Sequence, residues 1–300
     1  MYKTKRLLIV SACLFVIYTG SGQELSVGAG VGASTYWGDL NSGAIFQDIK
    51  NSSGLQGQLF LTYQPSRIFT LRGNLAVGKI MGDDALSEKV WQRERNLSFQ
   101  TRLLDFSGRV MIHPWSIPLN DSHFVLTPFI SSGLSVFNFD PRTTYNGNMY
   151  RLQPLGTEGQ GMPGFGEKYQ LTQLSIPIGG GLKMQVSERM SVIIESYAHK
   201  TFTDYIDDVG AQYVNYFELL AGNGLLAAQL SDRSPEALGL SEPIDRPTGS
   251  AKGGKFGDYY FMTSVSVVYR LASNNKRRVS KFGGDNVICP DRSSWILRGK

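Results

Sequence analysis

Cysteine, charge and long apolar runs are all scarce in this sequence of 300 residues. Its two cysteines cannot build a disulfide framework, and no Cys/His spacing fits a zinc site. Charged residues make up only 18%, where about 25% is usual, and no apolar run approaches the ~20 residues of a membrane-spanning helix. Glycine is abundant instead, with 34 residues, as are tyrosine with 14 and phenylalanine with 16. This composition favours β-structure and excludes a bundle of membrane helices.

The first 23 residues have the pattern of a secretory signal peptide. A basic start at residues 3–6 precedes an apolar run from Leu7 to Tyr18, and small residues follow. We expect cleavage near Gly20 to Gln23. A lipoprotein processing site at Cys13 is an alternative, but the apolar run continues beyond that cysteine, so we interpret Cys13 as part of the signal core.

The net charge of +5 is concentrated at the two ends of the chain. Residues 272–300 form a basic tail, the signal adds more positive charge, and the body over 24–271 is slightly acidic. Such a body does not favour nucleic-acid binding. We expect the tail to be periplasmic and to hold the candidate partner contacts Lys276, Arg277, Arg278, Lys281, Cys289 and Arg292.

From residue 24 onward the dominant hydrophobic period is two. Apolar and polar side chains alternate in eight segments, at 25–37, 55–64, 69–78, 104–112, 124–139, 173–185, 190–203 and 261–271. These candidate strands run about 10–14 residues, which is enough to cross a bilayer when tilted. In hydrocarbon every backbone polar group needs a partner, and strands meet that need only in a closed sheet.

Connection lengths and aromatic positions point to the same architecture. Short turns at 64–67 and 187–189 contrast with long connections at 38–54, 80–97, 139–170 and 204–257. Aromatic residues near the predicted strand ends are interpreted as headgroup-level side chains: Tyr36, Trp37, Tyr63, Phe69, Trp115, Phe137, Phe139, Tyr205, Tyr259, Tyr260 and Tyr269.

The predicted fold is therefore an all-β, eight-stranded, antiparallel up-and-down transmembrane β-barrel of the outer-membrane type over residues 24–271. We expect long extracellular loops, with the N-terminus and the tail in the periplasm. The segment Tyr216–Leu230 predicts one or two short helices over the barrel mouth, broken at Gly222 and Gly224. Exposed leucines there would indicate a protein partner.

Seven charged or titratable side chains fall on the inward face of the predicted strands. Side chains just fill the lumen of an eight-stranded barrel, so we expect a polar network there and no open pore. Its predicted members are Arg72, Asp105, Arg109, Lys183, Glu195, His199 and Arg270. The inward glycines of the first strand, Gly28, Gly30 and Gly32, are expected to leave room for large polar partners.

An enzymatic interpretation rests on His199. With Glu195 and Tyr197 nearby, it resembles a general base oriented by a carboxylate, as in a small barrel enzyme acting on lipid or lipopolysaccharide. No nucleophile motif such as G-x-S-x-G accompanies it, so the lumen network is the preferred interpretation. The acidic residues at 204–208 lack the spacing of a known calcium loop and are interpreted as a solvated loop. We expect no catalytic residue, metal, cofactor or small-molecule substrate.

Six segments together resemble a known family. They are YWGDLN at 36–41, TPF at 127–129 leading to FNFDP at 137–141, LQPLGTEGQG at 152–161, KTFTDYIDDV at 200–209, DRS at 232–234 and GDYY at 257–260. In this order they resemble the PorG-like outer-membrane β-barrel proteins of the Bacteroidetes. That family is associated with the type IX secretion system and, in gliding species, with gliding motility.

The resemblance implies a non-enzymatic component of a protein secretion machine. Its expected partners are outer-membrane lipid and the periplasmic ring proteins of the type IX secretion system, which such a barrel would anchor or organise. A passive structural or adhesive barrel of the outer membrane is the remaining alternative.

Overall fold

The computed structural model describes residues 24–41, 52–118, 125–210, 212–254 and 257–273 of the 300-residue chain. The predicted signal peptide lies outside the described residues. So do the six candidate partner contacts of the tail, Lys276, Arg277, Arg278, Lys281, Cys289 and Arg292.

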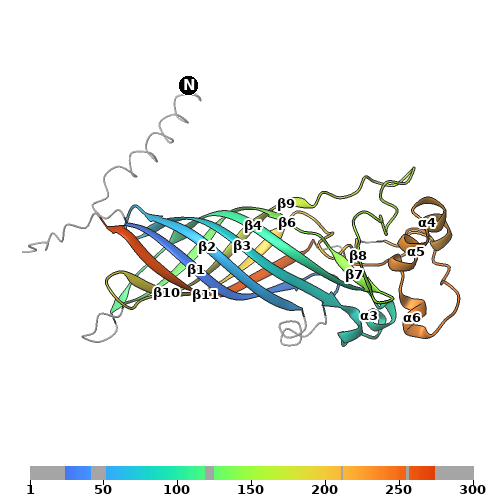
Figure 1. The fold of residues 1–300 in the computed structure, drawn as a ribbon, viewed down its shortest axis with the longest axis horizontal. Coiled ribbons are helices and arrows are strands. Elements are labelled where there is room, and N and C mark those ends of the chain that lie inside the picture. The colour runs from blue at the N-terminus through green and yellow to red at the C-terminus, as the bar shows by residue number, and fades with distance from the viewer. Residues whose placement is uncertain (1–23, 42–51, 119–124, 211, 255–256, 274–300) are drawn as a thin grey trace, which may run out of the picture.

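Eight long strands close into one antiparallel barrel, as predicted. They are β1 (Glu24–Trp37), β2 (Ser53–Gln64), β3 (Phe69–Asp83), β4 (Ser98–Ile112), β6 (Val125–Asn138), β9 (Thr172–Gln185), β10 (Met190–Thr201) and β11 (Tyr259–Ser273). Each pairs with the next, and β11 pairs with β1 to close the cylinder (Figure 1). The last strand ends two residues beyond the predicted boundary. Among the described helices, none is long and apolar enough to cross a bilayer.

The two ends of the barrel differ in their connections (Figure 1). At the terminal end, where β1 begins and β11 finishes, short links join β2 to β3 and β9 to β10, and the two-residue strand β5 (Ile117–Pro118) precedes β6. At the opposite, capped end, the connections carry η1 (Asp84–Leu86), α3 (Val90–Arg95), β7 (Arg142–Tyr145), β8 (Asn148–Arg151), α4 (Tyr216–Gly222), α5 (Leu225–Ser231) and α6 (Ser234–Leu238). The predicted pair of short helices is confirmed as α4 and α5.

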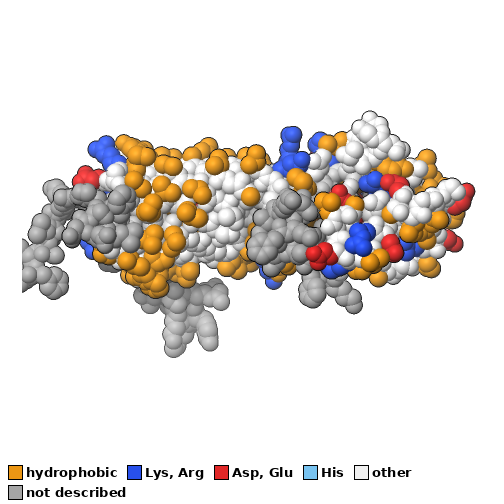
Figure 2. All heavy atoms as spheres, turned by 90° about the horizontal axis from the view of Figure 1, so that it is seen from below, with side chains coloured by type: hydrophobic (Ala, Val, Ile, Leu, Met, Phe, Trp, Pro, Cys, Tyr) orange, Lys and Arg blue, Asp and Glu red, His pale blue; other side chains and the backbone are white. Residues whose placement is uncertain are grey.

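The period-two alternation turns the apolar side chains of every barrel strand outward. Leu55, Val31 and Leu134 are 87, 71 and 69% exposed, values that a core side chain does not show. Figure 2 shows apolar side chains spread over the visible face of the barrel, whereas charged side chains concentrate over the cap and the barrel ends. An apolar surface that encircles the molecule is the exterior of a membrane barrel.

The inward glycines make room for packing of a different kind from the one predicted. A Cβ at Gly28 would overlap the ring of Phe60 on the neighbouring strand β2. The guanidinium of Arg72 lies over that ring, 3.4 Å from its centroid. The space above Gly28 is therefore occupied by an aromatic ring, and the polar partner stacks on the ring.

Two glycines on adjacent strands provide a matched test of this packing. At Gly32 on β1 a Cβ would overlap the backbone carbonyl of Thr263, whereas at Gly57 on β2 nothing lies within 4 Å. We expect Gly32→Ala to lower the free energy of unfolding by about 1–3 kcal/mol, because a backbone must move. Gly57→Ala should be neutral or slightly stabilising. Urea unfolding in the same lipid vesicles measures both, and equal effects would contradict this packing.

The aromatic residues near strand ends divide into two groups. Trp37, Phe69, Trp115 and Tyr269 are exposed, as headgroup-level side chains would be. The same placement predicted for Tyr36, Phe137, Phe139 and Tyr260 is wrong, since these side chains are fully buried in one hydrophobic cluster at the capped end. Tyr205 also turns inward and stacks on Tyr169, with 4.8 Å between ring centroids. The long connections fold over the mouth, so aromatic rings near it form the core of a cap.

Candidate functional site

The centre of the lumen holds a buried ion pair between opposite walls of the barrel. Both terminal nitrogens of Arg72, on β3, donate to the carboxylate of Glu195, on β10, at 2.7 and 2.8 Å. The side-chain amide of Gln58 donates to the same carboxylate at 2.8 Å and to the hydroxyls of Ser264 and Ser266. This two-pronged pair links walls that share no backbone hydrogen bonds.

Nearer the mouth, His199 and Asp105 belong to a second buried cluster. His199 Nδ1 lies 3.5 Å from Asp105 Oδ2 and 3.3 Å from the hydroxyl of Ser175. Tyr260 donates to the same Asp105 oxygen at 2.8 Å, and its ring stacks on the imidazole. His199 therefore pairs with Asp105, while Glu195 is engaged by Arg72. The alternative enzymatic pair of His199 and Glu195 is not assembled, and both side chains are buried, as the preferred lumen network requires.

Of the other three predicted lumen residues, Arg109 lies close enough to Asp105 and His199 to interact with them electrostatically, and the other two lie nearer the terminal end. Arg109 stacks over the ring of Tyr197 at 4.0 Å and donates to Ser107. Arg270 pairs with Glu24 at 2.8 Å near the terminal end, where Lys183 also faces inward. Side chains thus occupy the lumen from the terminal end to the mouth, as expected for eight strands.

Over the mouth, three of the six segments that carry the family resemblance meet one another. The hydroxyl of Thr157 donates to Asp208 at 2.5 Å, and the backbone N–H of Gly210 donates to Glu158 at 2.8 Å. These contacts join LQPLGTEGQG to KTFTDYIDDV. Phe139, from FNFDP, stacks on Tyr169, which donates to Asp208 at 2.6 Å. The cap, rather than the barrel wall, is where these motifs come together.

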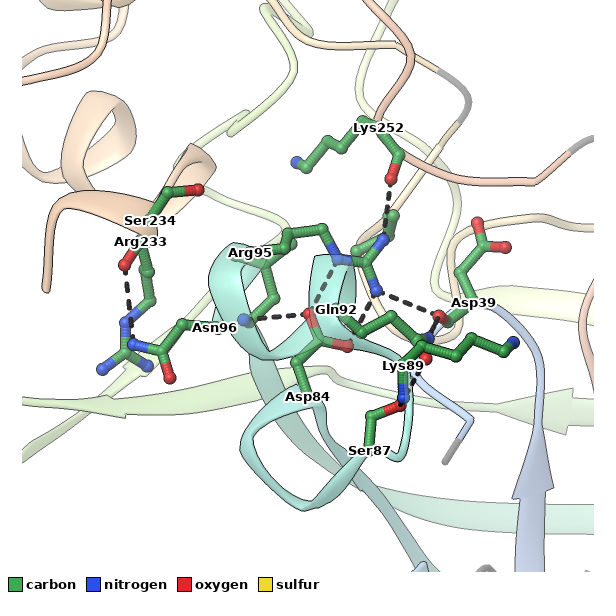
Figure 3. Close-up of polar contacts among 12 residues, drawn as sticks. Asp39, Asp84, Ser87, Lys89, Gln92, Arg95, Asn96, Arg233, Ser234 and Lys252 are labelled. Carbon is green, nitrogen blue, oxygen red and sulfur yellow. Dashed lines mark hydrogen bonds and ion pairs between the residues drawn. The ribbon is translucent and has the colours of Figure 1, made fainter. Parts of the chain in front are cut away.

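Arg95 fastens the α3 connection to two other connections (Figure 3). Its guanidinium donates to both carboxylate oxygens of Asp84, at 2.7 and 2.9 Å. It also donates to the backbone carbonyls of Lys252, at 2.7 Å, and Asp39, at 2.9 Å. One buried side chain therefore holds three loops that are distant in sequence, which no sequence pattern indicated.

Tyr36, at the end of β1, is the centre of a second fastening point. Its hydroxyl oxygen lies 2.7 Å from Asp207 Oδ2 and 2.7 Å from Asp258 Oδ1, and it accepts a hydrogen bond from the backbone N–H of Asp39. A hydroxyl has one proton to donate. Both carboxyl contacts are hydrogen bonds only when one of the two carboxyls carries a proton and donates it to Tyr36.

The environment of these acids favours their protonated forms. Burial, followed by repulsion from Asp258, raises the pKa of Asp207 well above its usual value, and burial does the same for Asp258. Burial raises the pKa of Asp208 to about 7, although Thr157 and Tyr169 donate to it. The pKa of Asp204 also rises to about 7, through burial and the nearby carboxylates of Asp39 and Glu158.

The prediction of a solvated acidic loop at 204–208 is therefore wrong. Asp207 and Asp208 are buried, because backbone N–H groups and the hydroxyls of Tyr36, Thr157 and Tyr169 replace water around them. The described residues contain no group of three or more His, Cys, Asp or Glu side chains arranged to hold a metal ion.

A cleft of about 530 Å³ opens beside α3, between Trp91, Tyr213 and the segment around Lys252. Most of its cations already have partners. Arg95 is bound to Asp84, Arg246 to Asp232 at 2.6 Å, and Lys252 to Glu158 at 3.0 Å. These three ion pairs hold the walls of the cleft together, and three further charged residues, Asp39, Lys89 and Glu94, also line it.

Solved structures similar to this chain are β-barrel proteins. Neisserial surface protein A is 8% identical, with a TM-score of 0.38, and the match covers 84% of this chain and 97% of that one. The attachment invasion locus protein Ail of Yersinia pestis, solved with the heparin analogue sucrose octasulfate, is 9% identical, with a TM-score of 0.35 and coverages of 83 and 97%. The N-terminal barrel domain of Pseudomonas aeruginosa OprF is 12% identical, with a TM-score of 0.33 and coverages of 83 and 98%.

One family model matches the sequence. It is described as a domain of unknown function, DUF6089, and it covers residues 5–226, which include the first seven barrel strands and the beginning of the last long connection. No curated protein matches the chain.

Proposed function

The chain belongs to the DUF6089 family, and we propose that this member is a non-enzymatic outer-membrane barrel that anchors or organises the periplasmic ring of the type IX secretion system. The observation that carries the proposal is the pairing of an apolar exterior with a filled and capped interior. Such a barrel offers neither a conduit nor a reaction site, so it acts through the surfaces of its two ends.

Membrane placement is supported by the outward side chains. Their apolar atoms are exposed on all eight strands, and in water such a surface would drive association. Acyl chains cover it at no cost, while the closed sheet satisfies the backbone. A signal peptide at residues 1–23, expected from the sequence, would deliver the chain to the outer membrane of a cell with two membranes.

A scaffolding role is supported by the contacts that Glu195 and His199 make inside the barrel. Glu195 is bound by Arg72, and His199 lies against Asp105 and Ser175, all of them buried. Because barrel residues already bind both side chains, the observed contacts favour a structural role for Glu195 and His199 over an enzymatic one. The resemblance to PorG-like proteins suggests the type IX secretion system as the assembly that such a scaffold would serve.

The direct test is a crosslinked pull-down from native membranes with a tag inserted in a cap loop. We expect periplasmic ring proteins of the type IX system to be captured, and a deletion strain to lose export of type IX cargo. Normal export from the deletion strain would contradict the secretion role and favour a passive or adhesive barrel.

The basic tail is the first surface to test within that experiment. Removing residues 274–300 takes away all six candidate contacts, and we expect capture of the ring proteins to fall several-fold. Added salt should weaken capture by the full chain as well, because the expected partner surface is acidic. A variant with Lys276, Arg277 and Arg278 changed to glutamine is the matched control for length. Capture that the truncation leaves unchanged would remove the tail from the interface.

A further inference from the structure

Two like-charged side chains face each other on the outer surface of the barrel, at the edge of its apolar belt. Lys79 on β3 and Arg102 on β4 are direct cross-strand partners. The next pair on the outer face, two residues nearer the terminal end, is Val77 and Leu104, whose apolar side chains are exposed. The outer surface therefore changes from hydrocarbon to paired positive charge within two residues.

Among the described residues, neither Lys79 nor Arg102 has an acidic partner. Like charges directly opposite each other on a sheet are destabilising unless a counter-ion lies near. One carboxylate, that of Asp140, lines the cleft of about 170 Å³ that Lys79 and Arg102 share with Arg142 and Met149. Asp140 already accepts hydrogen bonds from Arg142 at 2.7 Å and Arg151 at 2.8 Å.

The pKa of Asp140 agrees with this arrangement. Burial alone would raise it, but the hydrogen bonds from Arg151 and Arg142 outweigh burial and hold the pKa below its usual value. Asp140 therefore stays ionised and is shared by two arginines. The cleft keeps an excess of positive charge, because three cationic side chains, Lys79, Arg102 and Arg142, line it with one carboxylate.

The height of the pair along the barrel identifies the anion that fits it. On β3 the outward apolar side chains run from Phe69 to Val77. At ~3.4 Å per residue and ~40° of tilt, that stretch is about 21 Å tall, close to the ~25 Å apolar band of membrane barrels. Lys79 and Arg102 then lie about 5 Å beyond its edge, where lipid phosphates are found.

We propose that Lys79 and Arg102 bind the phosphate of a membrane lipid whose acyl chains lie against Val77 and Leu104. Arg102 supplies a planar fork and Lys79 a point charge, the two kinds of donor used for phosphate. The inference rests on the membrane placement proposed above, but not on the secretion role.

The test uses the full processed chain, folded in detergent and analysed by native mass spectrometry. It is titrated with phosphatidic acid, with phosphatidylcholine of the same acyl chains and with inorganic phosphate. We expect wild-type protein to prefer phosphatidic acid, and the double variant K79Q/R102Q to bind it at least tenfold more weakly. Lys200→Gln is the matched control, because Lys200 is an exposed outward lysine on β10; its affinity should remain within twofold of wild type.

Three results would overturn the proposal. They are equal affinity of wild type and K79Q/R102Q for phosphatidic acid, equal affinity of the wild type for both lipids, and displacement of the lipid by inorganic phosphate at equal concentration. The last result would assign the pair to free phosphate. Heat-modifiable migration in gels checks that both variants fold. Failure of the membrane placement would appear separately, as folded protein that stays monodisperse once detergent is removed.

Discussion

Glu195→Gln should lower the free energy of unfolding of the barrel by about 3–5 kcal/mol, the largest effect expected from a single substitution in the lumen. Glutamine keeps the shape of the side chain but removes its charge, which leaves the Arg72 guanidinium buried and uncompensated between β3 and β10. The amide nitrogen of the new residue would also face a donor. Urea unfolding in lipid vesicles, followed by fluorescence, measures the loss.

Two further variants separate the charge effect from general damage. Replacing both partners by apolar residues, Arg72→Met with Glu195→Leu, should recover much of the loss, because no unpaired charge is left. Glu236→Gln weakens the partly exposed pair with Arg233 in the cap, where the carboxylate is solvent-accessible, and should cost no more than about 1 kcal/mol. If Glu195→Gln costs as little as Glu236→Gln, the lumen pair does not brace the barrel.

The inward position of this pair was predictable, but its partnership was not. Alternation places Arg72 and Glu195 on the polar face of their own strands, and a closed barrel turns that face inward. Which inward side chains meet depends on the register of the strands and on their stagger across the lumen. The alternation of apolar and polar residues along one strand gives no information on either. For the same reason the sequence suggests Glu195, four residues away, as the neighbour of His199, whereas the carboxylate beside His199 is that of Asp105 on β4.

The cap was the part of the molecule that sequence patterns described least well. Position near a strand end groups the aromatic residues as one class, yet alternation distinguishes them: Trp37 shares the outward side of Val31, and Tyr36 faces the lumen. The contacts made by Arg95 and Asp207 join loops far apart in sequence, so only the assembled structure could reveal them.

Raising the pH from 6 to 9 should loosen the cap while the barrel strands stay intact. Acids whose folded-state pKa is raised bind more protons in the folded than in the unfolded chain, so the stability they contribute is complete below their unfolded pKa of ~4. It is lost as the pH rises from that value through the folded one, which is about 7 for Asp208; burial raises the pKa of Asp207 and Asp258 in the same direction. Each excess proton contributes a slope of about 1.4 kcal/mol per pH unit across that window.

Hydrogen exchange detected by mass spectrometry resolves the cap from the barrel. After correction for intrinsic exchange rates, we expect protection of the segment 202–210 to fall at least tenfold between pH 6 and 9, while β1 and β2 keep theirs. Asp207→Asn is the informative variant, because its amide can donate permanently to the Tyr36 hydroxyl oxygen, which Asp207 does only when protonated. Its protection should fall less steeply over the same range. A wild-type cap whose protection does not change with pH would mean that Tyr36, Asp207 and Asp258 share no proton beyond that of the hydroxyl.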